Sequence, residues 1–297
     1  MDKSNEEEVL CSFMVFRLPR QCQSPLAHCS LMTERGDPPS MRRVNTEEVA
    51  VARKIIHDAK AVTVLTGAGI STDSGIPDFR GPNGLWTTNP EAERASNIRF
   101  YVSDPELRRN NWALRANGDL WADVEPNDGH WALVALERQD KLHTLITQNV
   151  DELHQRAGTS AQRIVEIHGT TRQAGCLDCT YRVPMSEVLG RVRAGEPDPA
   201  CPNCGGILKS ATISFGQSLI ADDLQRAHEA AKACDVFLAV GTSLTVFPIN
   251  ESARIAHRHG ARLVIVNAEP TPFDDLAEVV VRGNISDTLP ELVRPLP

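Results

Sequence analysis

Apolar residues recur along the chain in two patterns, one with a helical period and one in short unbroken runs. Val49, Ala52, Ile55 and Ile56 fall on one face of a helix that begins near Thr46. Short apolar runs with little polar alternation are typical of buried parallel strands. Five such runs occur, at residues 61–66, 142–147, 163–168, 235–240 and 262–267. Helical patterns lie between most of them, at residues 128–138, 221–232 and 248–259.

Strands that alternate with helices predict an α/β fold, a doubly wound parallel sheet of the Rossmann-like kind. The alternation stops between residues 171 and 211, where two cysteine pairs and several prolines and glycines occur. We expect a small module here, inserted into the larger domain. The predicted organisation is a flexible N-terminal extension (1–43), the first part of a nucleotide-binding domain (44–170), the inserted module (171–211) and the second part of the domain (212–297).

The composition narrows the classes of partner. The 297 residues carry a formal net charge of -8, which argues against direct binding of nucleic acid, since that usually attracts a basic face. No apolar run approaches the ~20 residues that a membrane span needs. The N-terminus is acidic where a secretory signal peptide is basic. We therefore expect a cytoplasmic protein that contacts neither a membrane nor nucleic acid directly.

Two Cys-x-x-Cys pairs within residues 171–211 predict a metal site. Cys176 and Cys179 are separated by 21 residues from Cys201 and Cys204. In a reducing compartment such pairs indicate metal rather than disulfides. Two knuckles of this kind bring four thiolates into the tetrahedron that Zn²⁺ accepts, and four protein ligands leave no position for a reactant. We expect one structural zinc ion in the inserted module, which is too small to fold by core burial alone.

Small or polar residues follow each of the five predicted strands, at the edge where doubly wound sheets bind ligands. They are GAGIS (67–71), QNVD (148–151), His168, GTS (241–243) and Asn267. Glycines let a backbone approach a ligand closely, and the amides after them can cradle phosphate. Arg80 suits pyrophosphate, and Asn267 with Glu269 suits ribose hydroxyls. The sequence therefore predicts a nucleotide site along this edge.

His168 is the candidate general base, because Gln148, Asn149 and Asp151 are expected at the same edge. We expect the other histidines to be hydrogen-bonded structural residues. His130 stands in PNDGH before a predicted helix, and we expect it to brace the start of that helix.

Several motifs together resemble those of the sirtuins, the NAD-dependent protein lysine deacylases, in a bacterial-type form. They are GAGISTDSGIPDFRG (67–81), TQNVDELHQRAG (147–158), IHG (167–169), the two cysteine pairs, ISFG (213–216), GTSLTVFP (241–248) and VNAEPTP (266–272). The resemblance runs in the family's order from about residue 44 to the C-terminus. It implies NAD as cofactor, a structural Zn²⁺ and acyl-lysine proteins or peptides as substrates.

The resemblance also implies roles for single residues. His168 would be the general base, with Asn149 as the second catalytic residue. The NAD site would be lined by Gly67, Ala68, Gly69, Asp78, Phe79, Arg80, Trp86, Gln148, Asn149, Asp151, Gly241, Thr242, Ser243, Asn267, Glu269 and Ile285. The acyl-lysine tunnel would be walled by Ile213, Phe215 and Val246, with strand-like backbone pairing to the substrate peptide.

The implied reaction transfers the acyl group from lysine to ADP-ribose and releases nicotinamide. Two alternatives stay open: a mono-ADP-ribosyltransferase with the same pocket, and a non-catalytic sensor of NAD or ADP-ribose. His168 and Asn149 argue against the sensor, which needs no general base. The sequence departs from the family at Gln217, where an acid is usual, and at Ser210, where proline is usual.

Sirtuins that remove acidic acyl groups carry a Tyr-x-x-Arg pair. The corresponding place here is Trp112 to Arg115. Because an indole offers no phenol hydroxyl, we expect a neutral acyl group such as acetyl. The other interpretation is that Trp112 only packs a helix.

Overall fold

The computed structural model describes residues 45–81, 84–118 and 124–296. Its larger sheet has six parallel strands in the order β3-β2-β1-β7-β8-β9. They are β1 (Val62–Thr66), β2 (Leu142–Thr147), β3 (Ile164–Glu166), β7 (Val236–Val240), β8 (Arg262–Val266) and β9 (Val279–Val281). The predicted doubly wound sheet is confirmed, and all five predicted strands form. Strand β9 was not predicted, because its three valines are too few to show a period.

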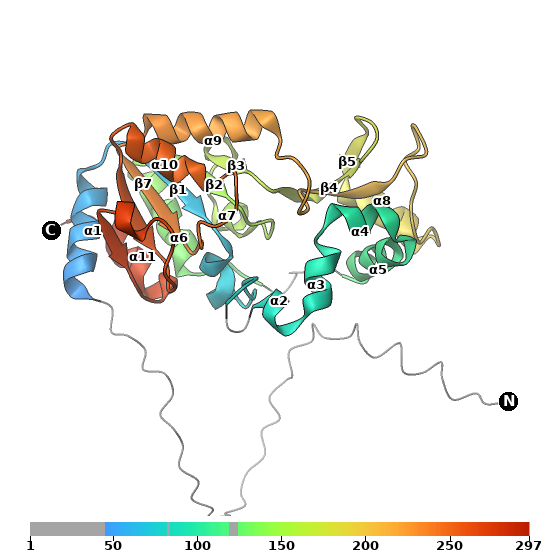
Figure 1. Ribbon diagram of the computed structural model, residues 1–297, viewed down its shortest axis with the longest axis horizontal. Helices are drawn as coiled ribbons and strands as arrows, with labels where there is room; N and C mark the ends of the chain where they lie inside the picture. Colours follow the sequence, from blue (N-terminus) through green and yellow to red (C-terminus); the bar gives the residue numbers. More distant parts are fainter. Residues whose placement is uncertain (1–44, 82–83, 119–123, 297) are drawn as a thin grey trace, which may run out of the picture. The chain divides into compact units, whose positions relative to one another are not determined.

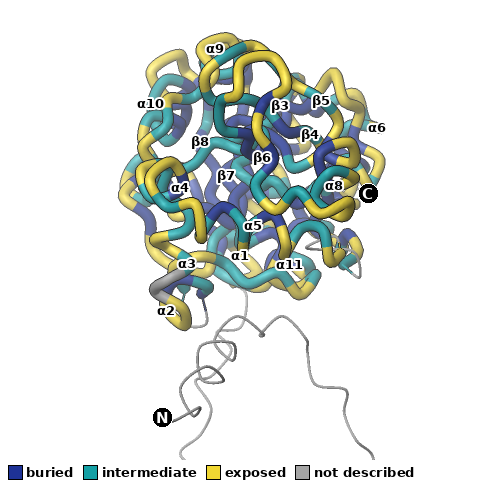
Figure 2. The backbone as a smooth tube through the Cα atoms, turned by 90° about the vertical axis from the view of Figure 1, so that its right-hand side faces the viewer, coloured by how far each residue is buried: buried dark blue, intermediate teal, exposed yellow. Residues whose placement is uncertain are grey.

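Helices cover both faces of the six-stranded sheet (Figure 1). One face carries α1 (Thr46–Asp58), α6 (Asp128–Arg138) and α11 (Ile285–Val293), and the other carries α9 (Ala221–Ala233) and α10 (Glu251–Arg258). Val64 and Leu65 are neighbours on β1, yet they pack into the clusters of opposite faces. The sheet is therefore buried on both sides; β7, buried along its whole length, is dark blue in Figure 2.

Side-chain caps define where two of these helices begin. Asn45 accepts a hydrogen bond from the N–H of Glu47 at the start of α1. At the start of α6 the Asn127 side chain accepts from the N–H of Gly129, and the His130 ring accepts from the N–H of Asn127. The prediction that His130 braces this helix start is confirmed. Helix α10 begins only at Glu251, because residues 246–250 form a turn instead of its predicted first part.

A second, antiparallel sheet has the order β5-β4-β6 and contains both cysteine pairs at its loops. Its strands are β4 (Gly169–Cys176), β5 (Arg182–Pro184) and β6 (Leu208–Thr212). Helix α8 (Met185–Arg193) lies between β5 and β6 in the chain. Its small apolar cluster includes Ala174, Val188 and Leu208. Trp112 completes this cluster from another part of the chain and is 0% exposed.

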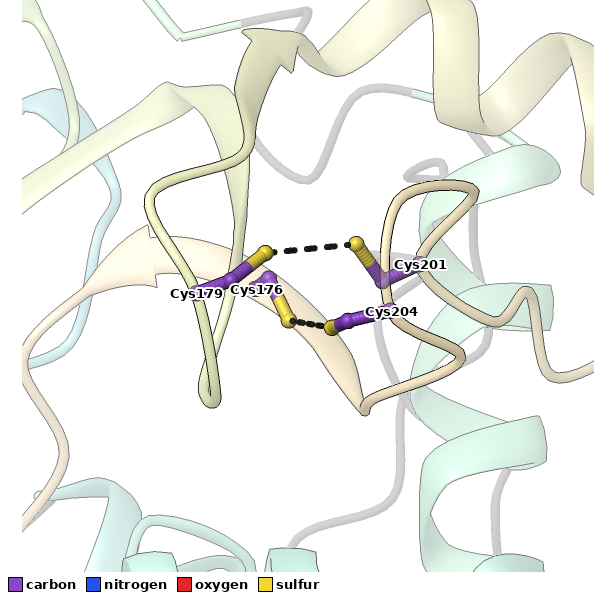
Figure 3. A group of neighbouring side chains, drawn as sticks. All are labelled: Cys176, Cys179, Cys201 and Cys204. Carbon is purple, nitrogen blue, oxygen red and sulfur yellow. Dashed lines mark hydrogen bonds between the residues drawn. The ribbon is translucent and has the colours of Figure 1, made fainter.

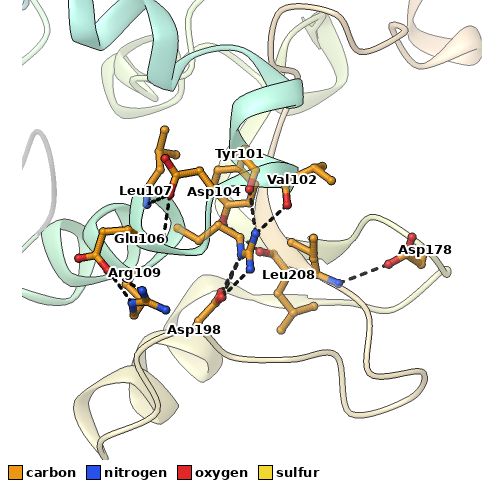
Figure 4. A network of polar contacts seen from close by, with 11 residues as sticks. Tyr101, Val102, Asp104, Glu106, Leu107, Arg109, Asp178, Asp198 and Leu208 are labelled. Carbon is orange, nitrogen blue, oxygen red and sulfur yellow. Dashed lines mark hydrogen bonds and ion pairs between the residues drawn. The ribbon is translucent and has the colours of Figure 1, made fainter.

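Trp112 belongs to α5 (Pro105–Ala116), which with α4 (Ile98–Ser103) is attached to this sheet by polar contacts (Figure 4). The Arg108 guanidinium forms a salt bridge of 2.9 Å with Asp198 and also donates to the carbonyls of Tyr101 and Val102. The Tyr101 hydroxyl donates to the carbonyl of Leu208 at 3.0 Å. Residues before 170 therefore pack on the cysteine module, while the domain boundaries at 170/171 and 211/212 stay predictions.

The remaining short elements lie in the connections: η1 (Ala68–Ser74), α2 (Leu85–Thr88), α3 (Pro90–Ala95), α7 (Leu153–Ala157), η2 (Ala161–Arg163) and η3 (Asp274–Leu276). The predicted extension over residues 1–43 lies outside the described residues. Within the described ranges, every helix is too short or too polar to cross a membrane.

Candidate active site and metal centre

The loops after β1 and β7 touch through their backbones, since these two strands are neighbours. The N–H of Gly67 donates to the carbonyl of Val240 at 3.0 Å, and that of Gly69 donates to the carbonyl of Gly241 at 2.9 Å. Gly241 has a φ of 60°, and a Cβ on it would stand 2.4 Å from the Ile70 nitrogen. The glycines are therefore needed for loop-to-loop contact, and their expected role against phosphate stays a prediction.

The amide side chains of Gln148 and Asn149, just after β2, present their oxygens as free acceptors. The Gln148 amide nitrogen donates to the Thr66 carbonyl and to the Thr242 hydroxyl, at 3.3 and 2.8 Å. The Asn149 amide nitrogen donates to the Gly67 carbonyl at 3.1 Å. Carbonyls only accept, so in both amides the nitrogen must face inward. No residue in the described ranges donates to either side-chain oxygen, and both therefore fit the ribose hydroxyls of NAD.

Asp151 is held as an oriented carboxyl group behind these amides. Its two oxygens accept from the Ser71 hydroxyl at 2.7 Å and from the Leu153 N–H at 3.0 Å. The residue is 7% exposed. Burial raises the pKa of Asp151 above its ordinary value, and these hydrogen bonds act in the opposite direction.

His168 follows β3, and its hydrogen bonding determines which ring nitrogen can act as a base. The Nδ1 atom lies 3.0 Å from the main-chain carbonyl of Gln148. A carbonyl only accepts, so Nδ1 carries the proton and Nε2 carries the lone pair of the neutral ring. Burial lowers the pKa of His168 below its ordinary value, and the bond to Gln148 partly opposes this. The geometry suits the predicted general base.

The loop after η1 forms an aromatic cluster with a guanidinium above it. The rings of Phe79 and Phe215 lie 5.0 and 5.1 Å from that of Trp86, between centroids. The Arg80 guanidinium stands over the Trp86 ring at 4.6 Å. Asp78 accepts from the N–H of Gly81 at 2.9 Å, which gives this acid a structural purpose within the loop. The expected contacts of Asp78, Phe79, Arg80 and Trp86 with NAD stay predictions.

Residues after β7 and β8 continue the same edge of the sheet. The Ser243 hydroxyl contacts that of Thr245 at 2.8 Å. The Asn267 side chain donates to the carbonyl of Glu269, which shapes the turn after β8. Ile285 is 7% exposed and belongs to the core cluster shared with α1 and α6. Ala68 is half-buried in η1, and the cofactor roles of all these residues stay predictions.

The segment predicted to meet the substrate links the active site to the antiparallel sheet. The N–H of Ile213 donates to the carbonyl of His168 at 2.7 Å, so this residue lies beside the candidate base. The backbone of Phe215 is already paired, since its N–H donates to Ser96 and its carbonyl accepts from Ile98. Unless this segment rearranges, the main chain of Phe215 therefore cannot form strand-like hydrogen bonds with a substrate peptide. Val246 is half-buried after β7.

The two departures from the family pattern have defined partners. The Gln217 side-chain oxygen accepts from the N–H of Ser214 at 2.8 Å and closes the turn that displays Phe215. Ser210 is buried in β6, and its hydroxyl is 3.3 Å from an Arg115 nitrogen. Trp112 is fully buried in the cluster of the cysteine module, as the packing interpretation requires.

The four cysteines predicted to bind zinc converge from two loops, one after β4 and one before β6 (Figure 3). All four sulfurs lie within 4.8 Å of one another, and the pairs Cys176–Cys204 and Cys179–Cys201 are each 3.6 Å apart. A Zn–S bond of about 2.3 Å places the sulfurs of a tetrahedron about 3.8 Å apart. The donor set and its spacing therefore fit a structural Zn²⁺.

Ser71 lies among the site residues, although it was not predicted to be one of them. This serine is 0% exposed; it donates to Asp151 and accepts from the Asn149 amide nitrogen at 3.2 Å. A serine four residues into a glycine-rich loop carries no periodic signal that would separate it from a solvent-facing turn residue. Only the packing of the loop shows that it joins two predicted site residues.

Comparison with known proteins agrees with this site. The profile of the Sir2 family matches residues 67–248, which include both glycine loops, His168 and the cysteine group. "NAD-dependent protein deacetylase 2" of Streptomyces coelicolor is 52% identical over 79% of this chain and 97% of its own length.

Solved structures agree as well. One described as "Structural Basis for the Mechanism and Regulation of Sir2 Enzymes" has a TM-score of 0.74 and 39% identity, covering 84% of this chain and 97% of its own. A "Sir2-p53 peptide-NAD+" complex has a TM-score of 0.69 and 32% identity, covering 80% and 93%. The predicted resemblance is thereby confirmed, and this chain belongs to the Sir2 family.

Proposed function

We propose that the protein is an NAD-dependent protein lysine deacetylase, which transfers the acyl group from lysine to ADP-ribose and releases nicotinamide. The observation that carries this proposal is the arrangement after β2 and β3. There the lone pair of the neutral His168 ring stands on Nε2, and the side-chain oxygens of Gln148 and Asn149 accept from no residue in the described ranges. The deacetylase of Streptomyces coelicolor and the Sir2 complex with peptide and NAD+ support the assignment.

Each residue contributes a separate part of the chemistry. When bound, NAD supplies the ribosyl carbon that receives the acyl oxygen as nicotinamide leaves. Gln148 and Asn149 would orient the ribose by accepting hydrogen bonds from its hydroxyls. His168 would remove a ribose hydroxyl proton at Nε2, and a water molecule would then complete the acyl transfer and release the free lysine. Asp151 would accept a hydrogen bond from the amide N–H of nicotinamide. Ile213, Phe215 and Val246 exclude water from the acyl-lysine chain.

The zinc ion, held by the four cysteines, has a structural role. It would tie the loops after β4 and before β6 together and so hold β6, whose continuation carries Ile213. All four ligands are protein thiolates, so the ion takes no part in the reaction.

We propose acetyl as the preferred acyl group. Trp112 is fully buried in the cysteine module, and the Arg115 guanidinium is bound by Asn111 and Ser210. The indole of Trp112 offers no phenol hydroxyl to an acyl carboxylate, and two of the Arg115 donors already have partners within the protein. We also propose a cytoplasmic location, which keeps the zinc thiolates reduced. Fractionation of native cells with an antibody against the chain tests that location.

The decisive experiment is mass spectrometry of an acetyl-lysine peptide incubated with zinc-loaded protein, with and without NAD. We expect loss of the acetyl mass only with NAD, together with nicotinamide and acetyl-ADP-ribose. His168→Ala should bind NAD but react ~100-fold to ~10,000-fold more slowly. A gain of ADP-ribose mass on the peptide or the enzyme would establish the transferase instead. If NAD binds but acetyl-, propionyl- and succinyl-peptides all stay intact, the deacetylase proposal is wrong, and the transferase and the sensor are then separated by whether any ADP-ribose mass is gained.

A further inference from the structure

Two buried histidines lie beneath the candidate active site and have no part in the reaction described above. His130 on α6 is 0% exposed, and His154 on α7 is 1% exposed. Their rings are 4.9 Å apart, between centroids. Each of them starts a chain of hydrogen bonds that ends on residues of the candidate site.

The chain from His154 reaches the main chain of Asn149. The Thr66 hydroxyl donates its only proton to the Thr147 hydroxyl at 2.9 Å. Thr66 must therefore accept from Nε2 of His154, which lies 3.0 Å away. The Thr147 hydroxyl in turn accepts from the N–H of Asn149 at 3.1 Å. This polarity requires a neutral His154 with its proton on Nε2, and accordingly the buried Nδ1 has no partner.

The chain from His130 reaches the side chains of the site. Nε2 of His130 lies 3.5 Å from the Ser71 hydroxyl, and Nδ1 lies 3.3 Å from the Asn127 main-chain nitrogen and 3.1 Å from the Asn127 side-chain oxygen. Because Ser71 gives its only proton to Asp151, the contact with Nε2 is a hydrogen bond when the ring proton stands on Nε2, and Nδ1 then accepts from the N–H of Asn127. Ser71 gives its own proton to Asp151 and accepts from the Asn149 amide. Ser71 is thereby held from three sides, and with it the orientation of two proposed site residues.

Both chains need uncharged rings, and the surroundings keep them uncharged. Burial lowers the pKa of His154 well below its ordinary value, and the neighbouring His130 ring lowers it further. Burial likewise lowers the pKa of His130, to about 4. A proton on Nδ1 of His154 would have no acceptor, so this nitrogen is suited to staying bare.

We propose that His154 and His130 are positioning residues, which set the main chain and side chain of Asn149 for the nicotinamide ribose end of NAD. The inference rests on the proposed function, since it assigns this end of the cofactor to Asn149. The hydrogen bonds give each histidine a distinct target: His154 acts on the main chain through Thr66 and Thr147, and His130 acts on the side chain through Ser71.

The test compares the affinities of variants for NAD and for ADP, which lacks both nicotinamide and the ribose assigned to Asn149. His154→Phe removes the donor, whereas His154→Gln offers an amide N–H near the position of Nε2. We expect His154→Phe to bind NAD about 10-fold more weakly while its affinity for ADP changes less than threefold. His154→Gln should recover most of the loss. His228→Phe is the matched control, because His228 also has a buried ring nitrogen without a partner but lies on α9.

A double-mutant cycle with Thr147→Val decides whether His154 acts through the threonines. If it does, the losses of NAD affinity in the two single variants do not add in the double variant. Additive losses, or equal losses for NAD and ADP, would overturn the positioning role in favour of a general packing defect. An unchanged NAD affinity in His154→Phe would overturn it as well.

The binding readout separates this inference from the proposed function. Wild-type protein that binds NAD but fails to deacylate any peptide would contradict the proposed function alone, because the affinity comparison still reports on the two chains. Wild-type protein that deacylates, with a His154→Phe variant equal to it in affinity and kcat, would contradict the inference alone.

Discussion

Replacing Gly241 by alanine should disturb the predicted NAD-binding edge of the sheet, whereas alanine at a glycine with open space around it should not. Gly241 has a φ of 60°, in the left-handed region, where a residue with a side chain is strained. The Cβ of an alanine there would stand 2.4 Å from the Ile70 nitrogen and 2.7 Å from the Gly69 carbonyl carbon. Both are main-chain atoms, so no side chain can move aside. The loops must separate, which breaks the bonds from Gly67 to Val240 and from Gly69 to Gly241.

The size of the effect follows from these contacts. A left-handed conformation costs a non-glycine residue about 1–2 kcal/mol. Two main-chain hydrogen bonds contribute about 1 kcal/mol each. Gly241→Ala should therefore lower the free energy of unfolding by about 3–4 kcal/mol. Gly260 offers the matched control, since its φ is 89° and a Cβ there meets nothing within 4 Å. Gly260→Ala should lose only about 1–2 kcal/mol.

Urea unfolding followed by circular dichroism measures both free energies, and calorimetric titration with NAD measures binding. We expect Gly241→Ala to lose NAD binding at temperatures where it is still folded, and Gly260→Ala to keep it. If the two variants lost the same stability and bound NAD equally, the two loops would not be pressed together as described.

Four further outcomes are expected. Cys204→Ser should abolish stoichiometric zinc in elemental analysis and lower the unfolding temperature; full zinc content in the variant would contradict the four-thiolate site. Asp198→Asn should lower the free energy of unfolding by about 2 kcal/mol, because it removes the charged hydrogen-bond partner of the Arg108 guanidinium, which is 9% exposed; an unchanged urea midpoint would show that the bridge contributes nothing. The midpoint of the acid limb of the kcat/KM profile should lie below pH 6.5, because burial lowers the pKa of His168 and keeps the base neutral to a lower pH. A midpoint above 6.5 would refute this. The free energy of unfolding should drop as the pH falls from 6.5 toward about 4, because His130 binds a proton in the unfolded chain but stays neutral in the folded protein, where its pKa is about 4. Equal urea midpoints at pH 7 and 4.5 would count against it.

Local sequence patterns were sufficient to predict many of the strands and site residues of this protein. The five apolar runs became strands because a strand buried on both faces of a parallel sheet carries mostly apolar residues, without polar alternation. The spacing of Cys176, Cys179, Cys201 and Cys204 predicted a thiolate tetrahedron, since two short knuckles can close on one ion without help from distant residues. The strand-end position of His168 was readable for the same reason: a strand, its end and its next residue are all local.

Relations between distant segments were decided only by the tertiary structure. Trp112 and Arg108 belong by sequence to the first domain part, yet they pack on the cysteine module, because a small sheet needs apolar cover that its own residues do not provide. The glycine at 241 looked like a ligand contact, and the fold shows a contact with another loop.

Ser71 and His154 carried no distinguishing pattern, since a buried polar residue is recognised by its partners and not by its neighbours in sequence. The sequence by itself thus determined five of the six parallel strands, the four clustered cysteines and the family. The tertiary structure alone decided which polar atoms are satisfied and which remain free for a ligand, because hydrogen bonding between loops depends on three-dimensional approach.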